Sequence, residues 1–129
     1  MTLTVKDALR AYARMLNTCD LEPLSPFLSD DFRYTSQMVL TSIGSKADFL
    51  TYMREKLDVI RGRDDRPVAE MGYLPAMFNR PCLVLSERDS NTAICTVLTE
   101  VSNQKLVQID LCLIPTPGSA KRTGERPGE

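Results

Sequence analysis

The chain has 129 residues, which is long enough for one domain with a buried core. Its 16 Lys and Arg residues balance 17 Asp and Glu residues, so the net charge of −1 argues against a basic surface for nucleic acid or an anionic membrane. The sequence has no histidine, which excludes Ser-His-Asp triads and Cys-His dyads and argues against zinc and other metal sites.

The first half of the sequence predicts helices around one strand. Thr4 and Asp7 have the spacing of a capping box, and apolar residues at helical spacing follow them. Residues 20–28 predict a second, short helix, and the alternating pattern of residues 32–38 predicts a strand. A third helix is expected over residues 45–62, between a serine cap and a glycine stop.

The second half changes to the period of strands. Four strands are expected over residues 67–78, 81–87, 91–101 and 105–114, separated by turn-forming residues. Residues 115–129 contain three prolines, three glycines and no bulky apolar residue, and they predict a disordered tail. Helices followed by antiparallel strands are typical of the α+β class.

The last predicted strand, "LVQIDLCLIP", places a carboxylate in an apolar run. Leu111 and Leu113 alternate with Asp110 and Cys112, so both faces of this strand are largely apolar. Because a chain of this length has few elements to bury both faces of the strand, a second subunit is the simplest explanation for the second apolar face. We therefore expect a homodimer through the sheet face that bears Leu111 and Leu113.

Three segments, "YARMLNTCDLEPLSPFLSDDFRYTS", "IGSKADFLTYM" and "VQIDLCLI", resemble the nuclear transport factor 2-like superfamily. This superfamily includes ketosteroid isomerases, SnoaL-like polyketide cyclases and limonene-epoxide hydrolases. The resemblance covers roughly residues 5–114 and implies a cone-shaped α+β barrel, in which N-terminal helices pack in a strongly curved, mostly antiparallel sheet. A pocket domain is thus expected over residues 1–114.

The resemblance to ketosteroid isomerases implies two catalytic residues, Tyr12 and Asp110, that donate hydrogen bonds to an oxyanion. Burial in a pocket would raise the pKa of Asp110 and keep its carboxyl group neutral. The position of the family's base is occupied by Ser36, which cannot take a proton from carbon without an activating partner. A different residue could serve as the base, and the candidates on predicted strands are Glu70, Glu87 and Glu100. An Asp-Arg-Asp arrangement of the epoxide hydrolase type is not evident in the sequence.

Further residues are expected to line the pocket beside this pair. The predicted ligand-binding residues are Tyr34, Ser36, Met38, Phe49, Met53 and Cys112. Simpler interpretations stand beside these: Tyr12 and the Met and Phe residues as ordinary core, and Asp110 as part of a polar cluster or facing solvent. The four cysteines lack C-x-x-C spacing and are interpreted as small buried residues.

The favoured function is a pocket that binds a small, largely apolar ligand with a carbonyl or hydroxyl group. One alternative is an isomerase, cyclase or hydrolase that uses Asp110 and Tyr12 without metal, histidine or cofactor. Another is a dimeric interaction module. The sequence shows neither a signal-peptide pattern nor an apolar run of the ~20 residues that span a bilayer, so a cytoplasmic location is expected.

Overall fold

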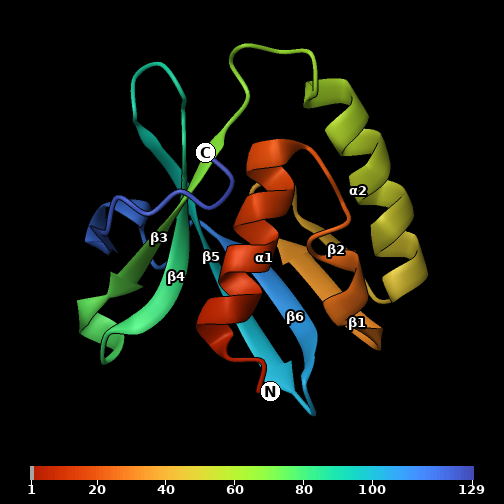
Figure 1. Cartoon of the computed structure of the whole chain (residues 1–129). Coiled ribbons are helices and arrows are strands. Elements are labelled where there is room, and N and C mark those ends of the chain that lie inside the picture. The colour runs from red at the N-terminus through yellow and green to blue at the C-terminus, as the bar shows by residue number, and fades with distance from the viewer. Residues whose placement is uncertain (1) are drawn as a thin grey trace.

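The computed structural model describes residues 2–129 as two helices on one curved sheet of seven strands (Figure 1). The strand order is β2-β1-β6-β5-β4-β3-β7. Strands β1 and β6 are parallel and all other neighbours are antiparallel, so the sheet is mixed, and it curves without closing into a barrel. The predicted α+β class is confirmed. Within the described residues, no helix is both long and apolar enough to cross a bilayer.

Both long helices begin at the predicted caps. Helix α1 spans Val5–Thr18 and has a capping box between Thr4 and Asp7, while α2 spans Lys46–Ile60 and is capped by Ser45. The prediction of a short helix over residues 20–28 is wrong. This segment instead forms turns and the 3₁₀ turn η1 (Ser25–Phe27), because prolines at positions 23 and 26 have no N–H for helical hydrogen bonds.

The four late strands are confirmed: β3, β5 and β6 are shorter than predicted, and β4 is shifted by one residue. The strands are β1 (Leu28–Ser36), β2 (Thr41–Ile43), β3 (Val68–Leu74), β4 (Arg80–Ser86), β5 (Ala93–Ser102), β6 (Lys105–Cys112) and β7 (Lys121–Arg122). The sequence patterns did not predict the short strands β2 and β7. Two further 3₁₀ turns, η2 (Pro75–Met77) and η3 (Pro117–Ser119), lie in the connections.

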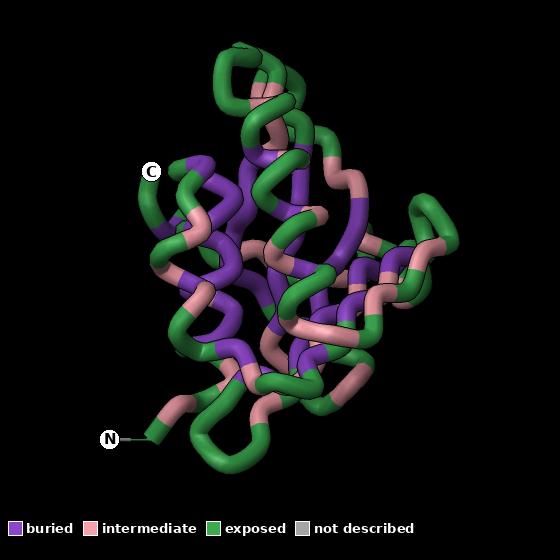
Figure 2. The backbone as a smooth tube through the Cα atoms, turned by 90° about the vertical axis from the view of Figure 1, so that its right-hand side faces the viewer, coloured by how far each residue is buried: buried purple, intermediate pink, exposed green. Residues whose placement is uncertain are grey.

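The inner, concave face of the sheet carries the main core. Helix α1 packs on this face against β3, β4 and β5, whereas α2 packs chiefly on β1. Figure 2 shows the buried residues along α1 and the strand centres, with exposed residues in the turns. Side chains of α1 such as Leu9 and Met15 are fully buried there. The core therefore lies between α1 and the sheet, with α2 closing one side.

The C-terminal segment differs from the disordered tail expected from its composition. Residues 113–120 lead from β6 to the edge of β3, where β7 pairs antiparallel with Gly72 and Tyr73. Ala120 packs against an apolar cluster of the outer sheet face, formed by Leu74, Cys82, Leu98 and Cys112. Backbone pairing and polar contacts hold the segment, and composition alone carries no information on either. The C-terminal segment thus covers part of the outer sheet face, on which Cys112 lies.

The predicted dimer face is wrong in one respect. Leu111 is only 3% exposed and belongs to the inner core, whereas Leu113 is 44% exposed beyond the end of β6. Because β6 ends at Cys112, strand alternation does not extend to Leu113. The two leucines therefore do not form one exposed surface.

Candidate functional site

Asp110 lies on the outer face of the sheet. Its neighbours in β6, Ile109 and Leu111, belong to the inner core, so alternation directs Asp110 outward. There its carboxylate accepts hydrogen bonds from the hydroxyl group of Thr35 on β1 and from the side-chain amide of Gln108. The hypothesis that Asp110 faces a pocket opposite Tyr12 is therefore wrong, and the interpretation as part of a polar cluster applies.

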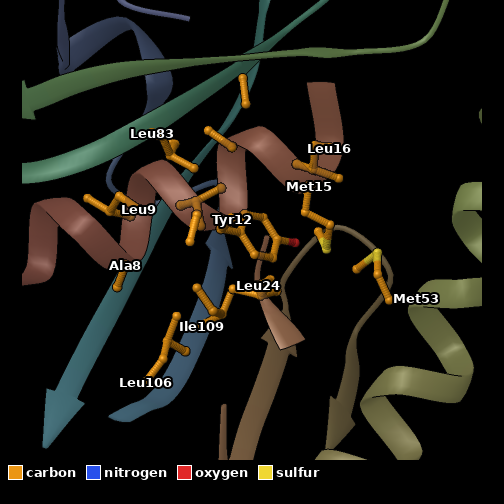
Figure 3. Packing of buried hydrophobic residues seen from close by; sticks show 14 of the residues in the cluster. Ala8, Leu9, Tyr12, Met15, Leu16, Leu24, Met53, Leu83, Leu106 and Ile109 are labelled. Atoms are coloured by element: carbon orange, nitrogen blue, oxygen red, sulfur yellow. The ribbon is translucent and has the colours of Figure 1, made fainter. Parts of the chain in front are cut away.

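Tyr12 lies inside the curve of the sheet and is 1% exposed. Figure 3 shows its hydroxyl group pointing to the side on which Met15 and Met53 lie, toward α2. Burial raises the pKa of Tyr12 well above its usual value, and the neighbouring groups of Tyr34 and Cys95 add to this effect. The sheet thus separates Tyr12 from Asp110, and the two do not form a donor pair.

A second tyrosine, Tyr34 on β1, lies on the same side as Tyr12. Its ring is fully buried and contacts two rings of α2, with centroid distances of 5.3 Å to Phe49 and 5.6 Å to Tyr52. Phe49 also packs edge-on against Phe32, at 4.7 Å. Aromatic side chains from β1 and α2 therefore pack against one another on the inner side of the sheet, among the residues predicted to line a pocket.

The hydroxyl group of Tyr34 is buried, and no group among residues 2–129 forms a hydrogen bond of good geometry with it. Burial raises its pKa above the usual range, with a further contribution from Tyr52, while Ser36 acts in the opposite direction. The Tyr52 and Ser36 side chains are therefore near, but neither makes a well-formed bond to this hydroxyl. An unpaired buried hydroxyl costs free energy, which is typical of a position that a ligand or water would satisfy.

Two more polar groups border this aromatic cluster. Burial raises the pKa of the Cys95 thiol to about 12, with a smaller effect of Cys112, and the ammonium group of Lys56 partly opposes the rise. The Lys56 nitrogen lies 5.8 Å from the centre of the Tyr52 ring. Lys56 and Tyr52 are only partly buried, so they form the rim on the α2 side.

We define the tyrosine cluster as Tyr12, Tyr34, Ser36, Tyr52 and Cys95. At neutral pH the raised pKa values keep both buried tyrosines and the thiol protonated. The cluster thus offers neutral hydrogen-bond donors in an apolar setting, without a carboxylate that could serve as a base. This chemistry suits binding of a neutral acceptor group better than proton abstraction.

The structure brings together five of the eight predicted site residues. Tyr12, Tyr34, Ser36, Phe49 and Met53 lie on the inner side of the sheet, all buried. The other three lie elsewhere: Met38 in an exposed turn, Asp110 in the outer polar group and Cys112 in the outer apolar cluster.

Sequence reasoning missed Tyr52, Lys56 and Cys95. The signal for the first two was available, because Phe49, Tyr52 and Lys56 share one face of α2 at spacings of three and four. The sequence pattern instead indicated an apolar stripe on this helix formed by Ala47, Leu50, Met53, Leu57 and Ile60. In the structure Ala47 is exposed and Leu50 only partly buried.

Comparisons with known proteins identify structures with a similar fold. No family model matches the sequence, and no curated protein matches it. The structure is similar to that of an NTF2-like protein of unknown function from Cytophaga hutchinsonii, with 14% identity, a TM-score of 0.60, and coverage of 89% of this chain and 96% of that chain. It is also similar to a SnoaL-like protein of unknown function from Burkholderia thailandensis, with 15% identity, a TM-score of 0.58, and coverage of 96% and 100%.

A de novo designed protein with a curved β-sheet gives a comparable match, with 18% identity, a TM-score of 0.59, and coverage of 83% of this chain and 82% of that chain. Identities this low show the fold and not an activity. The chain therefore has the nuclear transport factor 2-like fold that its sequence motifs predict.

Proposed function

We propose that the protein binds a small, neutral, largely apolar molecule whose carbonyl or hydroxyl oxygen accepts a hydrogen bond from Tyr34. The hydroxyl group of Tyr34 carries this proposal, since it lacks a well-formed hydrogen bond to residues 2–129 and a buried donor of this kind has the most to gain from a ligand. Protonated neighbours in the tyrosine cluster favour a neutral ligand over an anion. The cluster holds no candidate base, which favours binding without catalysis.

Entry to the cluster requires a movement, because Tyr12 and Tyr34 are at most 1% exposed. Helix α2 is the element best suited to move. It packs chiefly on β1 and buries only Phe49, Met53 and Leu57, while Val59 on the same helix is 67% exposed. Elements with few buried apolar contacts open at the lowest free energy.

The proposal is tested with neutral ketones of graded size, from cyclohexanone to a steroid ketone, titrated into the protein and followed by NMR chemical shifts. We expect shifts at β1 and α2, and roughly fivefold weaker binding to the Tyr34→Phe variant, since one hydrogen bond contributes about 1 kcal/mol. Tyr73→Phe is the matched control, because Tyr73 is 39% exposed on β3. Equal affinity of the Tyr34→Phe variant and the wild type would contradict the proposal.

A second candidate function is a dimeric interaction module, which the side-chain-filled interior favours. Exposed apolar residues gather where the β1–β2 turn meets the end of β6: Met38, Val39, Leu40, Leu113 and Ile114. Gln37 joins the two segments by accepting hydrogen bonds from the N–H groups of Leu113 and Ile114. Sedimentation velocity of the wild type and Leu40→Glu tests this candidate; a dimer that the substitution dissociates is the expected result, and a wild-type monomer excludes it.

A further inference from the structure

Residues 121–129, here called the strap, continue the sheet beyond β3. Strand β7 pairs with Gly72 and Tyr73, and the backbone pairing extends past it. The N–H of Met71 donates to the carbonyl of Glu125 at 2.8 Å, and the N–H of Thr123 donates to the carbonyl of Met71 at 3.0 Å. The strap thus occupies the hydrogen-bonding edge that β3 would otherwise present to solvent (Figure 1).

A buried carboxylate on β3 is paired entirely by the strap. Glu70 is 4% exposed, and all the partners recorded for it among residues 2–129 are strap residues. The Arg122 guanidinium donates to it at 3.1 Å, the N–H of Gly124 donates at 2.8 Å, and Arg126 lies at 3.7 Å. Since a buried carboxylate requires compensation, Glu70 marks a position built to receive this segment.

Two carboxylates of the strap in turn form ion pairs with arginine residues in the rest of the domain. Glu125 accepts from Arg10 of α1 at 2.7 Å, and Glu129 accepts from Arg88 at 2.8 Å. The hydrogen bond from Arg10 holds the pKa of Glu125 below its usual range. The charges of the strap therefore match those of its docking surface in both directions.

The backbone is also shaped for this contact. A Cβ atom on Gly72 would lie 2.7 Å from the carbonyl oxygen of Lys121, closer than such atoms approach, while its other neighbours would stay at ordinary distances. A Cβ atom on Gly128 would lie 2.8 Å from a side-chain carbon of Thr18 on α1. Two glycines, one on each partner, thus allow a close fit.

Exposed ion pairs help to hold the strap, beside the backbone pairing with β3. In the pair of Arg10 and Glu125 the side chains are 38% and 45% exposed, and such pairs are weak and screened by salt. Pro127 is the one buried residue of the strap, and its carbonyl accepts a hydrogen bond from Asn17 at 2.8 Å. The strap also forms one wall of a groove of about 350 Å³, beside Lys6 and Met71.

We propose that residues 121–129 are a releasable strap, which docks as one unit on β3 and α1 and whose release opens the β3 edge to an extended peptide segment. A free strand edge binds such segments through main-chain hydrogen bonds, and the strap occupies this edge in the same way. Release leaves the inner core intact, because the strap contributes little to it.

Hydrogen exchange of the full chain, read by mass spectrometry, tests the proposal with the Gly72→Ala variant. We expect at least tenfold faster exchange of the amides of Met71 and Thr123, with β5 unchanged. Gly62→Ala is the matched control, since a Cβ atom at position 62 would have no neighbour within 4 Å among residues 2–129. Unchanged protection of Met71 in Gly72→Ala would overturn the proposal, and so would a parallel loss of protection in β5, which would make the strap inseparable from the core.

Charge reversal gives an independent measurement. Glu125→Lys should increase exchange of the strap amides several-fold, and adding Arg10→Glu should restore protection. Glu55→Lys, an exposed substitution of equal charge change on α2, should have no effect. In the wild type, 1 M NaCl should reproduce the effect of Glu125→Lys, because the Debye length falls to about 3 Å. Failure of the double variant to recover protection would refute charge pairing as the holding force.

Discussion

Replacement of Tyr34 by phenylalanine separates the two properties of the tyrosine cluster, its stability and its capacity to bind. The substitution removes one oxygen and leaves the ring, which is 0% exposed and packs against Phe49 and Tyr52. The hydroxyl group gains no hydrogen bond on folding, although water solvates it in the unfolded chain. We therefore expect Tyr34→Phe to stabilise the ligand-free protein.

The size of the effect follows from the cost of an unpaired buried polar group, about 1–3 kcal/mol. Loss of a few dispersion contacts by the removed oxygen offsets part of it, which leaves a gain of about 1 kcal/mol. For a chain of 129 residues this gain corresponds to a rise in Tm of about 4 °C.

Urea unfolding followed by circular dichroism measures the free energy of unfolding, with calorimetry for Tm. Tyr73→Phe serves as the control, and its free energy of unfolding should change by less than about 0.5 kcal/mol because Tyr73 is exposed. A loss of 1 kcal/mol or more in Tyr34→Phe would refute the reasoning, since it would mean that Tyr52 or Ser36 forms a hydrogen bond with this hydroxyl in the folded protein.

Three other results are expected. Asn17→Ala should lower the free energy of unfolding by about 3 kcal/mol in urea titrations. The side-chain amide of Asn17 accepts a hydrogen bond from the N–H of buried Ala69 on β3 and donates one to its C=O. Native protein should resist iodoacetamide at pH 8, measured by mass spectrometry, since burial raises the pKa of Cys82 to about 11 and of Cys95 to about 12; rapid labelling of either would contradict this. The hydrogen bonds from Thr4 hold the pKa of Asp7 below its usual value, so their contribution is complete above the unfolded-state pKa of about 3.9 and is lost as pH falls through the lower folded-state value. Wild type should therefore lose its stability advantage over Asp7→Asn as the pH falls below about 4 in urea titrations, and a constant difference would count against the cap.

Local patterns were sufficient wherever neighbouring residues decide the structure. The capping box of Thr4 and Asp7 and the serine cap of α2 form as predicted, because each is completed within one turn of chain. Strand-like runs between turn residues likewise predicted β3, β4, β5 and β6. The failure over residues 20–28 is also local, since the two prolines there argued against a helix.

The candidate site was predicted in part. Tyr12, Tyr34, Phe49 and Met53 come together because each lies on the buried face of its own helix or strand. Asp110 was assigned to the wrong face. In a strand with apolar residues on both sides, the pattern does not say which side meets the core, and one register step reverses the answer.

Three features were decided only by the tertiary structure. The pairing of β1 with β6 sets the outward direction of Asp110, the approach of α2 to β1 isolates the hydroxyl of Tyr34, and β3 orders the strap. Each depends on residues distant in the chain, whose meeting local propensity does not encode. The sequence by itself determined the helices, most strands and the α+β class, because caps, periodicity and turn residues act over a few residues. The sites formed only where the folded chain brought remote segments together.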